Sequence, residues 1–230
     1  MSVVAAPGFV AGGIACGIKP SGAHDLAIVA TEDRAAVAVA GVFTTNLAQA
    51  APVQVSQRHL ADGRAASVVL SSGNANAATG ASGRRDAARM CELTAQGLGI
   101  ATEDVLVCST GLIGFPMPMD AVEVGIPKLC GQLTADGGAA AARAIMTTDT
   151  VAKEAVAHAG AATVGGMAKG AAMLSPAMAT MLAVVTTDAG LEQSQLRRAL
   201  ARAVGETFDC LSVDGCRSTN DTVLVLANGR

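Results

Sequence analysis

Residues 25–31, DLAIVAT, and residues 35–44, AAVAVAGVFT, are two short Val-rich runs separated by three charged residues. Runs of this length and composition, bounded by polar residues or glycine, are typical of β-strands. The same pattern recurs at residues 53–56 and in SVVLSS at residues 67–72. The first third of the chain therefore predicts a sheet.

Helical patterns appear further along the chain. Apolar side chains recur at helical spacing over residues 84–98, and Gly99 is a plausible helix stop. Further helices are predicted at residues 120–133, 139–146 and 191–207, and further strands at 105–109, within 161–187, at 211–214 and at 222–227. Runs of strands followed by helices favour an α/β or α+β layered sheet over regular βαβ alternation, without a firm domain boundary.

Composition narrows the class of protein. The 230 residues are 51% hydrophobic, so the chain is globular rather than disordered. Sixteen basic against nineteen acidic residues, without blocks of like charge, and only 2% aromatic residues argue against a nucleic-acid partner. No apolar run is long enough to cross a membrane, and the N-terminus lacks a basic leader, so a cytoplasmic protein is expected. Six scattered cysteines and three dispersed histidines predict neither disulfides nor a metal site.

Three polar or glycine-rich segments could carry chemistry. GNANAATG at residues 73–80 suits a tight turn with left-handed backbone positions. STGLIG at residues 109–114 follows a predicted strand, where its backbone N–H groups could bind an anion or oxyanion. MTTDT at residues 146–150 could cap the next element or bind a polar ligand. Each segment alone is also compatible with a purely structural turn.

A fourth segment, KGAAMLSPAMATML, occupies residues 169–182. Thr180 within it would by default be a strand threonine. Alternatively, cleavage of the bond between Ala179 and Thr180 would make Thr180 a new N-terminus. Its freed α-amine, with an ordinary pKa of about 8, would then be a general base next to the hydroxyl nucleophile.

Together these segments resemble the bifunctional ornithine acetyltransferase family, also called glutamate N-acetyltransferase, of arginine biosynthesis. Residues 169–182 resemble its self-processing signature, and GNANAATG and STGLIG resemble its GNANACTG and STGVIG loops. AIMTTDT with Lys153 resembles its IMTTDT-x-x-K segment, and SVDGCRSTNDTVLVLANG at residues 212–229 resembles a further family segment. The resemblance implies a layered α/β sandwich that is C-terminally truncated here. Residues 1–179 would form the α chain, and residues 180–230 the N-terminal part of the β chain.

The resemblance also implies roles for individual residues. Thr180 would be the nucleophile, first in cleavage after Ala179 and then in acyl transfer. Thr110 and Gly111 would form the oxyanion hole, and Thr147 and Lys169 would contact substrate. N-acetylornithine would acylate Thr180, ornithine would leave, and glutamate would take the acetyl group. No cofactor is required, acetyl-CoA is an additional acetyl donor in the family, and the cleaved chains assemble as α2β2.

Two other functions stay open. A self-processed amidase or aminopeptidase would resolve the same acyl-enzyme with water. An inactive fragment would need a partner chain, because family members continue well beyond residue 229. Ala172 stands where the family has glycine, and its Cβ would strain a backbone that needed a positive φ. Ala78, Cys216 and Arg217 are further departures, and none removes a predicted catalytic atom.

Overall fold

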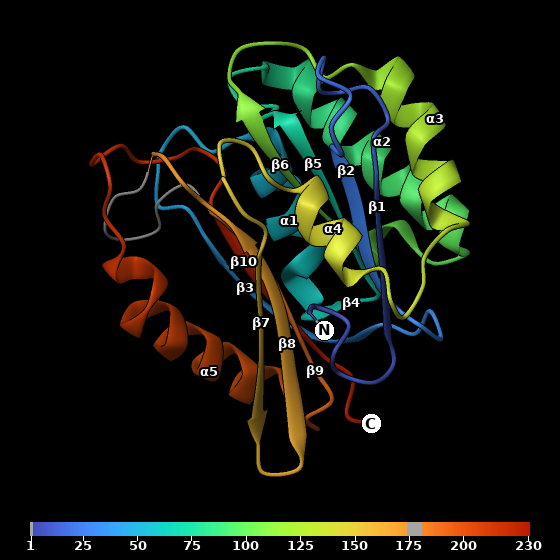
Figure 1. The fold of residues 1–230 in the computed structure, drawn as a ribbon, viewed down its shortest axis with the longest axis vertical. Helices are drawn as coiled ribbons and strands as arrows, with labels where there is room; N and C mark the ends of the chain where they lie inside the picture. Colours follow the sequence, from blue (N-terminus) through green and yellow to red (C-terminus); the bar gives the residue numbers. More distant parts are fainter. Residues whose placement is uncertain (1, 174–180) are drawn as a thin grey trace.

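The computed structural model describes residues 2–173 and 181–230. The predicted cleavage site, Ala179 and Thr180, lies outside the described residues. The strands form two sheets, which Figure 1 shows lying against each other in the middle of the molecule. The first sheet has the order β1 (Phe9–Ile14), β2 (Leu26–Thr31), β5 (Ser67–Asn74) and β6 (Val105–Leu112). The second has the order β4 (Arg64–Ala65), β3 (Val37–Phe43), β10 (Thr222–Ala227), β9 (Leu182–Thr187), β8 (Ala162–Lys169) and β7 (Lys153–Ala159).

Among the described residues, helices cover the outer faces of both sheets, whereas α4 (Gly138–Ala144) contributes alanines to the core between the sheets. The helices are α1 (Ala51–His59), α2 (Gly80–Leu98), α3 (Met119–Cys130), α4 (Gly138–Ala144) and α5 (Gln193–Glu206), with short 3-10 turns at Leu60–Asp62, Thr102–Asp104 and Phe208–Cys210. Helices α2 and α3 lie on one side of the molecule and α5 on the other (Figure 1). The architecture is thus helix, sheet, sheet, helix, which confirms the predicted layered α/β sandwich.

Alternation of side chains within the central strands produces this layering. In β2, Ala27 and Val29 face the other sheet, whereas Leu26 and Ile28 face the helical layer. In β10, Leu224 and Leu226 join the core between the sheets, while Val223 and Val225 pack with Leu196, Leu200 and Val204 of α5. Strands that are buried on both faces read as continuous apolar runs, because neither side of the sheet meets water.

Two predicted strands are wrong. Residues 53–56 lie in α1, where Pro52 occupies the first turn and so costs no hydrogen bond. The Ser56 hydroxyl both donates to the Val107 carbonyl at 2.7 Å and accepts from the Val107 N–H at 2.8 Å, so α1 is held along β6. Tertiary packing therefore overrides the β-preference of its valines. Residues 211–214 pair with neither sheet, and Val213 is 62% exposed.

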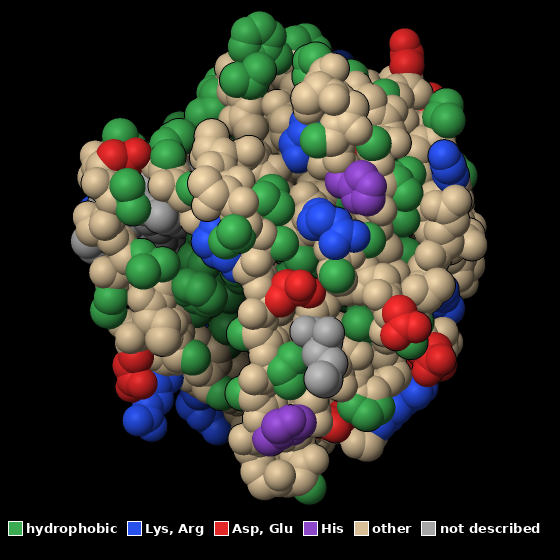
Figure 2. All heavy atoms as spheres, viewed as in Figure 1, with side chains coloured by type: hydrophobic (Ala, Val, Ile, Leu, Met, Phe, Trp, Pro, Cys, Tyr) green, Lys and Arg blue, Asp and Glu red, His purple; other side chains and the backbone are tan. Residues whose placement is uncertain are grey.

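The surface shows mixed character. Figure 2 shows acidic and basic side chains interspersed on the face in view rather than gathered by sign.

Within residues 2–173 and 181–230, no helix has the length and apolarity needed to cross a membrane, and no cluster of His, Cys, Asp and Glu could hold a metal ion. Three of the six free cysteines, Cys91, Cys108 and Cys130, are buried, and Cys210 and Cys216 are exposed.

Candidate functional site

Four of the residues predicted from the sequence line one pocket. Thr110 and Gly111 come from the end of β6, Lys169 from the end of β8, and Thr147 from the segment between α4 and β7. The pocket has a volume of about 430 Å³. Its other lining residues are Lys19, Pro20, Ser21, Gly73, Leu112, Thr148, Ala172 and Met173. Ala172 and Met173 belong to the segment that leads toward Ala179, so the chain runs from this pocket into the predicted cleavage site.

The backbone at Gly111 requires glycine. Its φ is +134°, and a Cβ would lie 2.3 Å from the carbonyl carbon of Gly73 on the neighbouring strand β5. The ladder between β5 and β6 shifts register at this point, because Asn74 pairs with both Thr110 and Leu112. Such an irregularity turns backbone N–H groups out of the regular ladder. The loop geometry is thus compatible with an oxyanion site formed by Thr110 and Gly111.

The GNANAATG loop fixes the backbone next to Gly111. Gly73, Asn76 and Gly80 have positive φ angles, as the sequence predicts. The Asn74 amide donates to the carbonyls of Phe115 and Pro116, and its oxygen accepts the Asn76 N–H at 2.7 Å. This loop therefore braces the pocket, because Asn74 binds backbone groups and Asn76 binds the Gly83 carbonyl and the Thr79 hydroxyl, and neither asparagine lines the cavity.

Asp149 organises the MTTDT segment. Its carboxylate accepts the backbone N–H of Thr147 at 3.1 Å and of Gly170 at 2.8 Å, and forms an ion pair with Lys153 at 2.5 Å. Burial alone would raise the pKa of Asp149, but the Lys153 ammonium and the two N–H groups bring this pKa below its usual value. Asp149 therefore stays ionised and ties Thr147 to the segment that follows Lys169.

Lys169 is a buried lysine that faces the oxyanion loop. Its side chain is 3% exposed, and its ammonium donates to the Thr110 hydroxyl at 3.3 Å. Burial lowers the pKa of Lys169, and the nearby carboxylates of Asp149 and Asp221 oppose this change. An ammonium has three donors, and among the described residues the Thr110 hydroxyl is its hydrogen-bond acceptor, so these contacts leave donor capacity for a ligand carboxylate.

Three polar residues of the site were missed from the sequence. Lys19 lines the pocket, and its ammonium donates at 2.7 Å to the carbonyls of His24 and Met146. The Asn220 amide donates to the Ser109 carbonyl at 2.9 Å and so holds the strand that leads to Thr110. Asp221, which is fully buried, accepts the Met181 N–H at 2.8 Å. Asn220 and Asp221 lie in the STND run, the only sequence signal for them, whereas Lys19 lies in no motif.

The expectation of strain at Ala172 is wrong. Its φ is not positive, and the non-glycine residue with a positive φ in this segment is the next one, Met173, at +58°. Asp214 accepts the Met173 N–H at 2.7 Å and holds this turn. Replacing glycine by alanine at position 172 therefore does not place a Cβ in the left-handed region.

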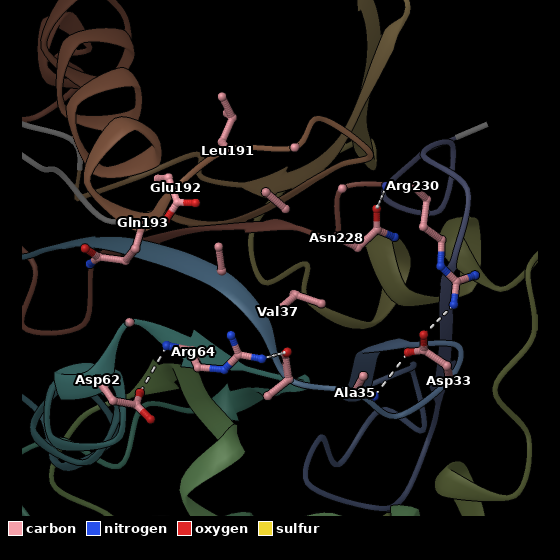
Figure 3. Close-up of a pocket in the computed structure, with 16 residues that line it drawn as sticks. Asp33, Ala35, Val37, Asp62, Arg64, Leu191, Glu192, Gln193, Asn228 and Arg230 are labelled. Carbon is pink, nitrogen blue, oxygen red and sulfur yellow. Dashed lines mark hydrogen bonds and ion pairs between the residues drawn. The ribbon is translucent and has the colours of Figure 1, made fainter.

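A larger cavity, of about 710 Å³, lies at the C-terminal end of β10. Figure 3 shows three pairings of its charged side chains: Arg230 with Asp33, Asp62 with the Arg64 N–H, and Arg64 with the Ala36 carbonyl. The described residues that line it include no Ser, Thr, Cys or His.

The fold defines a broad class of protein. An L-aminopeptidase D-Ala-esterase/amidase from Ochrobactrum anthropi, described as a variant of the Ntn-hydrolase fold, matches 98% of this chain and 73% of its own with a TM-score of 0.57. Its sequence is only 13% identical, so the match concerns the fold alone. The two packed sheets between helical layers are thus an Ntn-hydrolase-like sandwich.

Within that class the chain belongs to the ArgJ family, whose model matches residues 10–230. The arginine biosynthesis bifunctional protein ArgJ of Streptomyces coelicolor is 53% identical over 229 residues, which are 100% of this chain and 60% of that protein. The Mycobacterium leprae ArgJ is 53% identical over 99% of this chain and 58% of its own length. The chain thus spans about 60% of the length of these relatives. An ornithine acetyltransferase from Mycobacterium tuberculosis, solved with ornithine, is 41% identical with a TM-score of 0.70, over 76% of this chain and 94% of that one.

Proposed function

We propose that this protein transfers the acetyl group of N-acetylornithine to glutamate through an acyl-threonine at Thr180. One observation carries the proposal. In a chain of the ArgJ family, Thr110, Gly111, Thr147 and Lys169 line a single pocket, and the segment that leaves this pocket runs to Ala179 and Thr180. The pocket, at about 430 Å³, has the size of an amino-acid derivative.

Self-processing prepares the nucleophile in this proposal. The Thr180 hydroxyl attacks the Ala179 carbonyl carbon, the carbon–nitrogen bond breaks, and the departing nitrogen takes the hydroxyl proton. Water then hydrolyses the resulting ester, which leaves a carboxylate on Ala179 and a free hydroxyl and α-amine on Thr180. The match to the Mycobacterium tuberculosis enzyme covers 94% of that solved chain but only 76% of this one, so the solved chain is the shorter of the two. A chain shortened by cleavage would give such a match, and this supports the proposal.

Acetyl transfer then proceeds in two steps. The α-amine of Thr180 takes the hydroxyl proton while the oxygen attacks the acetyl carbon of N-acetylornithine, and ornithine leaves with that proton. The amine of glutamate next attacks the acyl-threonine and loses its proton as the hydroxyl is restored. Thr110 and Gly111 stabilise the oxyanion in both steps, and Lys169 and Thr147 hold the substrate. No cofactor takes part, and acetyl-CoA serves as a second acetyl donor to glutamate.

The arrangement of strands supports an assembly in which the cleaved chains stay together. Strand β9 follows the cleavage site and lies between β8 and β10, and β10 pairs in turn with β3. Residues 180–230 therefore hydrogen-bond on both sides to strands of residues 1–179. We propose that two such pairs form an α2β2 enzyme.

Intact mass spectrometry of the denatured protein tests self-processing. Two fragments that divide between Ala179 and Thr180 are expected, and a single species is expected for Thr180→Ala. Incubation with N-acetylornithine and glutamate should then yield ornithine and N-acetylglutamate. Free acetate formed without glutamate would identify a hydrolase instead. An uncut protein that transfers no acetyl group would contradict the proposal.

A further inference from the structure

Lys19 is a second ammonium on the wall of the pocket, and no step of the proposed reaction uses it. Its aliphatic stem packs against Gly73 in β5, where a Cβ on that glycine would lie 2.8 Å from Cγ of Lys19. Its Nζ donates at 2.7 Å to the carbonyls of His24 and Met146. An ammonium has three donors, so among the described residues these two bonds leave one donor of Lys19 for a ligand in the pocket.

The loop that carries Lys19 is held by a buried aspartate. Asp25 lies directly before β2 and is fully buried. Its carboxylate accepts three backbone N–H groups, at 2.7, 3.1 and 2.9 Å, from Cys16, Gly17 and Lys19. The backbone of Lys19 is thus fixed by Asp25, and its Nζ is fixed by the Met146 carbonyl far along the chain. Because the side chain is already ordered, little conformational entropy is lost when it binds a ligand.

The charged side chains that line the pocket are both cationic. Among the described residues of its wall these are Lys19 and Lys169, and neither Asp nor Glu is present there. Burial lowers the pKa of both lysines, and for Lys19 the nearby carboxylates of Asp25 and Asp149 oppose this change. Both carboxylates bind backbone N–H groups behind the wall. Since complementary charge selects a ligand, the wall favours a molecule that is negative at two points.

The two ammoniums are held at different parts of the pocket. Lys169 donates to the Thr110 hydroxyl and so lies beside the predicted oxyanion loop, where the amine of the acceptor has to react. The α-carboxylate of an amino acid is attached to the same carbon as that amine, and this brings it to Lys169. Nζ of Lys19 is held instead by the carbonyls of His24 and Met146, which do not belong to that loop. Lys19 is therefore the cation left for a carboxylate at the end of the acceptor's side chain.

We propose that Lys19 determines specificity by binding the side-chain carboxylate of an acidic amino acid, while Lys169 binds its α-carboxylate. This inference rests on the transfer to glutamate proposed above and names the residue that selects this acceptor. In that reaction the acyl-threonine is open to attack by the amine of glutamate and, in reverse, by the amine of ornithine. An ammonium near the end of the bound side chain attracts the carboxylate of glutamate and repels the ammonium of ornithine. Lys19 thus favours glutamate as the acceptor.

Calorimetric titration without an acetyl donor tests this role. Glutamate is compared with glutamine, which has the same shape but no charge on its side chain. The wild type should bind glutamate roughly 10- to 100-fold more tightly, the range that one charge-assisted hydrogen bond contributes. In Lys19→Met the dissociation constant for glutamate should rise until the two ligands bind almost equally. Lys128→Met, on an exposed position of α3, is the control and should keep the wild-type ratio.

The ratio of the two dissociation constants distinguishes recognition from a structural role. A lysine that only held the loop would, when replaced, weaken glutamate and glutamine alike, and that outcome would overturn the inference. A wild type that does not prefer glutamate, or does not bind it, would overturn it as well. Lys169→Met should weaken both ligands and keep their ratio, and loss of the ratio in that variant alone would assign the side-chain carboxylate to Lys169. If circular dichroism shows that Lys19→Met does not fold, Lys19→Gln decides, because its amide still donates to carbonyls but carries no charge.

The titration also separates this inference from the proposed function, because it needs neither cleavage nor transfer. A protein that shows the Lys19-dependent preference but moves no acetyl group supports the binding role of Lys19 and overturns the transfer alone. A protein that transfers acetyl groups to glutamate, and keeps the same KM for glutamate in Lys19→Met, overturns this inference and leaves the proposed function in place.

Discussion

At the scale of single residues, the pocket depends on buried polar groups held in unusual states. Lys169 is buried and donates to the Thr110 hydroxyl at 3.3 Å, Gly111 has a backbone conformation that leaves no space for a Cβ, and burial raises the pKa of Asp221. Each state costs stability, because a buried charge or a backbone with positive φ is unfavourable by itself. Strain and burial of this kind concentrate at functional sites.

Lys169→Met should weaken substrate binding more than it slows the chemical step. Methionine keeps most of the volume but cannot donate to a carboxylate, and one charge-assisted hydrogen bond contributes about 1.5–3 kcal/mol. The KM for glutamate should therefore rise on the order of 10- to 100-fold. Lys128→Met, on an exposed position of α3, is the control and should leave KM unchanged. An unchanged KM for glutamate in Lys169→Met would show that Lys169 does not bind this substrate.

Gly111→Ala should destabilise the protein and abolish cleavage. Its Cβ would meet the Gly73 carbonyl carbon at 2.3 Å in a backbone with φ +134°. We expect a loss of at least about 2 kcal/mol in the free energy of unfolding, measured by urea denaturation. Gly205→Ala in α5 meets nothing within 4 Å and should stabilise by about 0.5–1 kcal/mol. Equal stability of the two variants would show that the β5–β6 contact relaxes freely.

Asp221 should make stability depend on pH in a defined direction. Its pKa rises from 3.8 to about 7 on folding, so between these values the folded state holds a proton that the unfolded state has lost. The contribution of the protonated Asp221 carboxyl to the free energy of unfolding is fully present below pH 3.8 and is lost as pH rises through about 7. Between pH 5 and 8 the loss should be about 2–3 kcal/mol. Urea unfolding of Thr180→Ala and of Thr180→Ala/Asp221→Asn at several pH values isolates the effect of Asp221. If the free energy of unfolding depends on pH equally in both variants, the raised pKa is contradicted.

At the scale of elements, the apolar sequence pattern of helix α5 agrees with the side chains that the structure buries. Leu196, Leu200 and Val204 form its buried stripe against β10, and a capping box joins Glu192 to Gln195 at its start. The predicted helix 191–207 is accordingly confirmed. By contrast, the valines of α1 predict a strand although the segment is a helix. The local sequence pattern carries no information about the contact with β6 that Ser56 makes through Val107.

Leu196→Ala should test how firmly α5 covers its sheet. The side chain is 2% exposed, and its truncation leaves a cavity between α5 and β10. The free energy of unfolding should fall by about 2–4 kcal/mol. Arg198→Ala, on the exposed face of the same helix, should change it by less than about 0.5 kcal/mol. Thermal denaturation of both variants makes the comparison, and a similar loss in each would point to helix propensity instead of burial.

At the scale of the whole molecule, the order of strands decides what cleavage does. Because β9 and β10 lie inside the six-stranded sheet, a cut before residue 181 leaves the sheet continuous. The pocket likewise collects residues from β6, β8 and the segment after α4, which are far apart in the chain. The site is thus assembled by the stacking of the two sheets.

The cleaved protein should therefore stay whole under native conditions. Native mass spectrometry should show residues 1–179 and 180–230 in one species, which separates into two masses only on denaturation. The hydrogen bonds that β9 makes with β8 and β10 makes with β3, together with the α5 core that includes Ala40 of β3, account for this association. Thr180→Ala supplies the uncut reference. A 180–230 fragment that elutes alone in size-exclusion chromatography would contradict the strand order as the source of cohesion.

The sequence by itself determined the layered α/β class, most elements, the ArgJ-type motifs and four residues of the pocket, because buried strands, helical stripes and glycine-rich turns leave local signatures. Only the tertiary structure decided the rest. It placed residues 53–56 in a helix, showed that the asparagines of GNANAATG brace backbone, and brought Lys19, Asn220 and Asp221 to the site. These outcomes depend on which distant residues meet when the two sheets pack, and no local pattern of residues encodes such contacts.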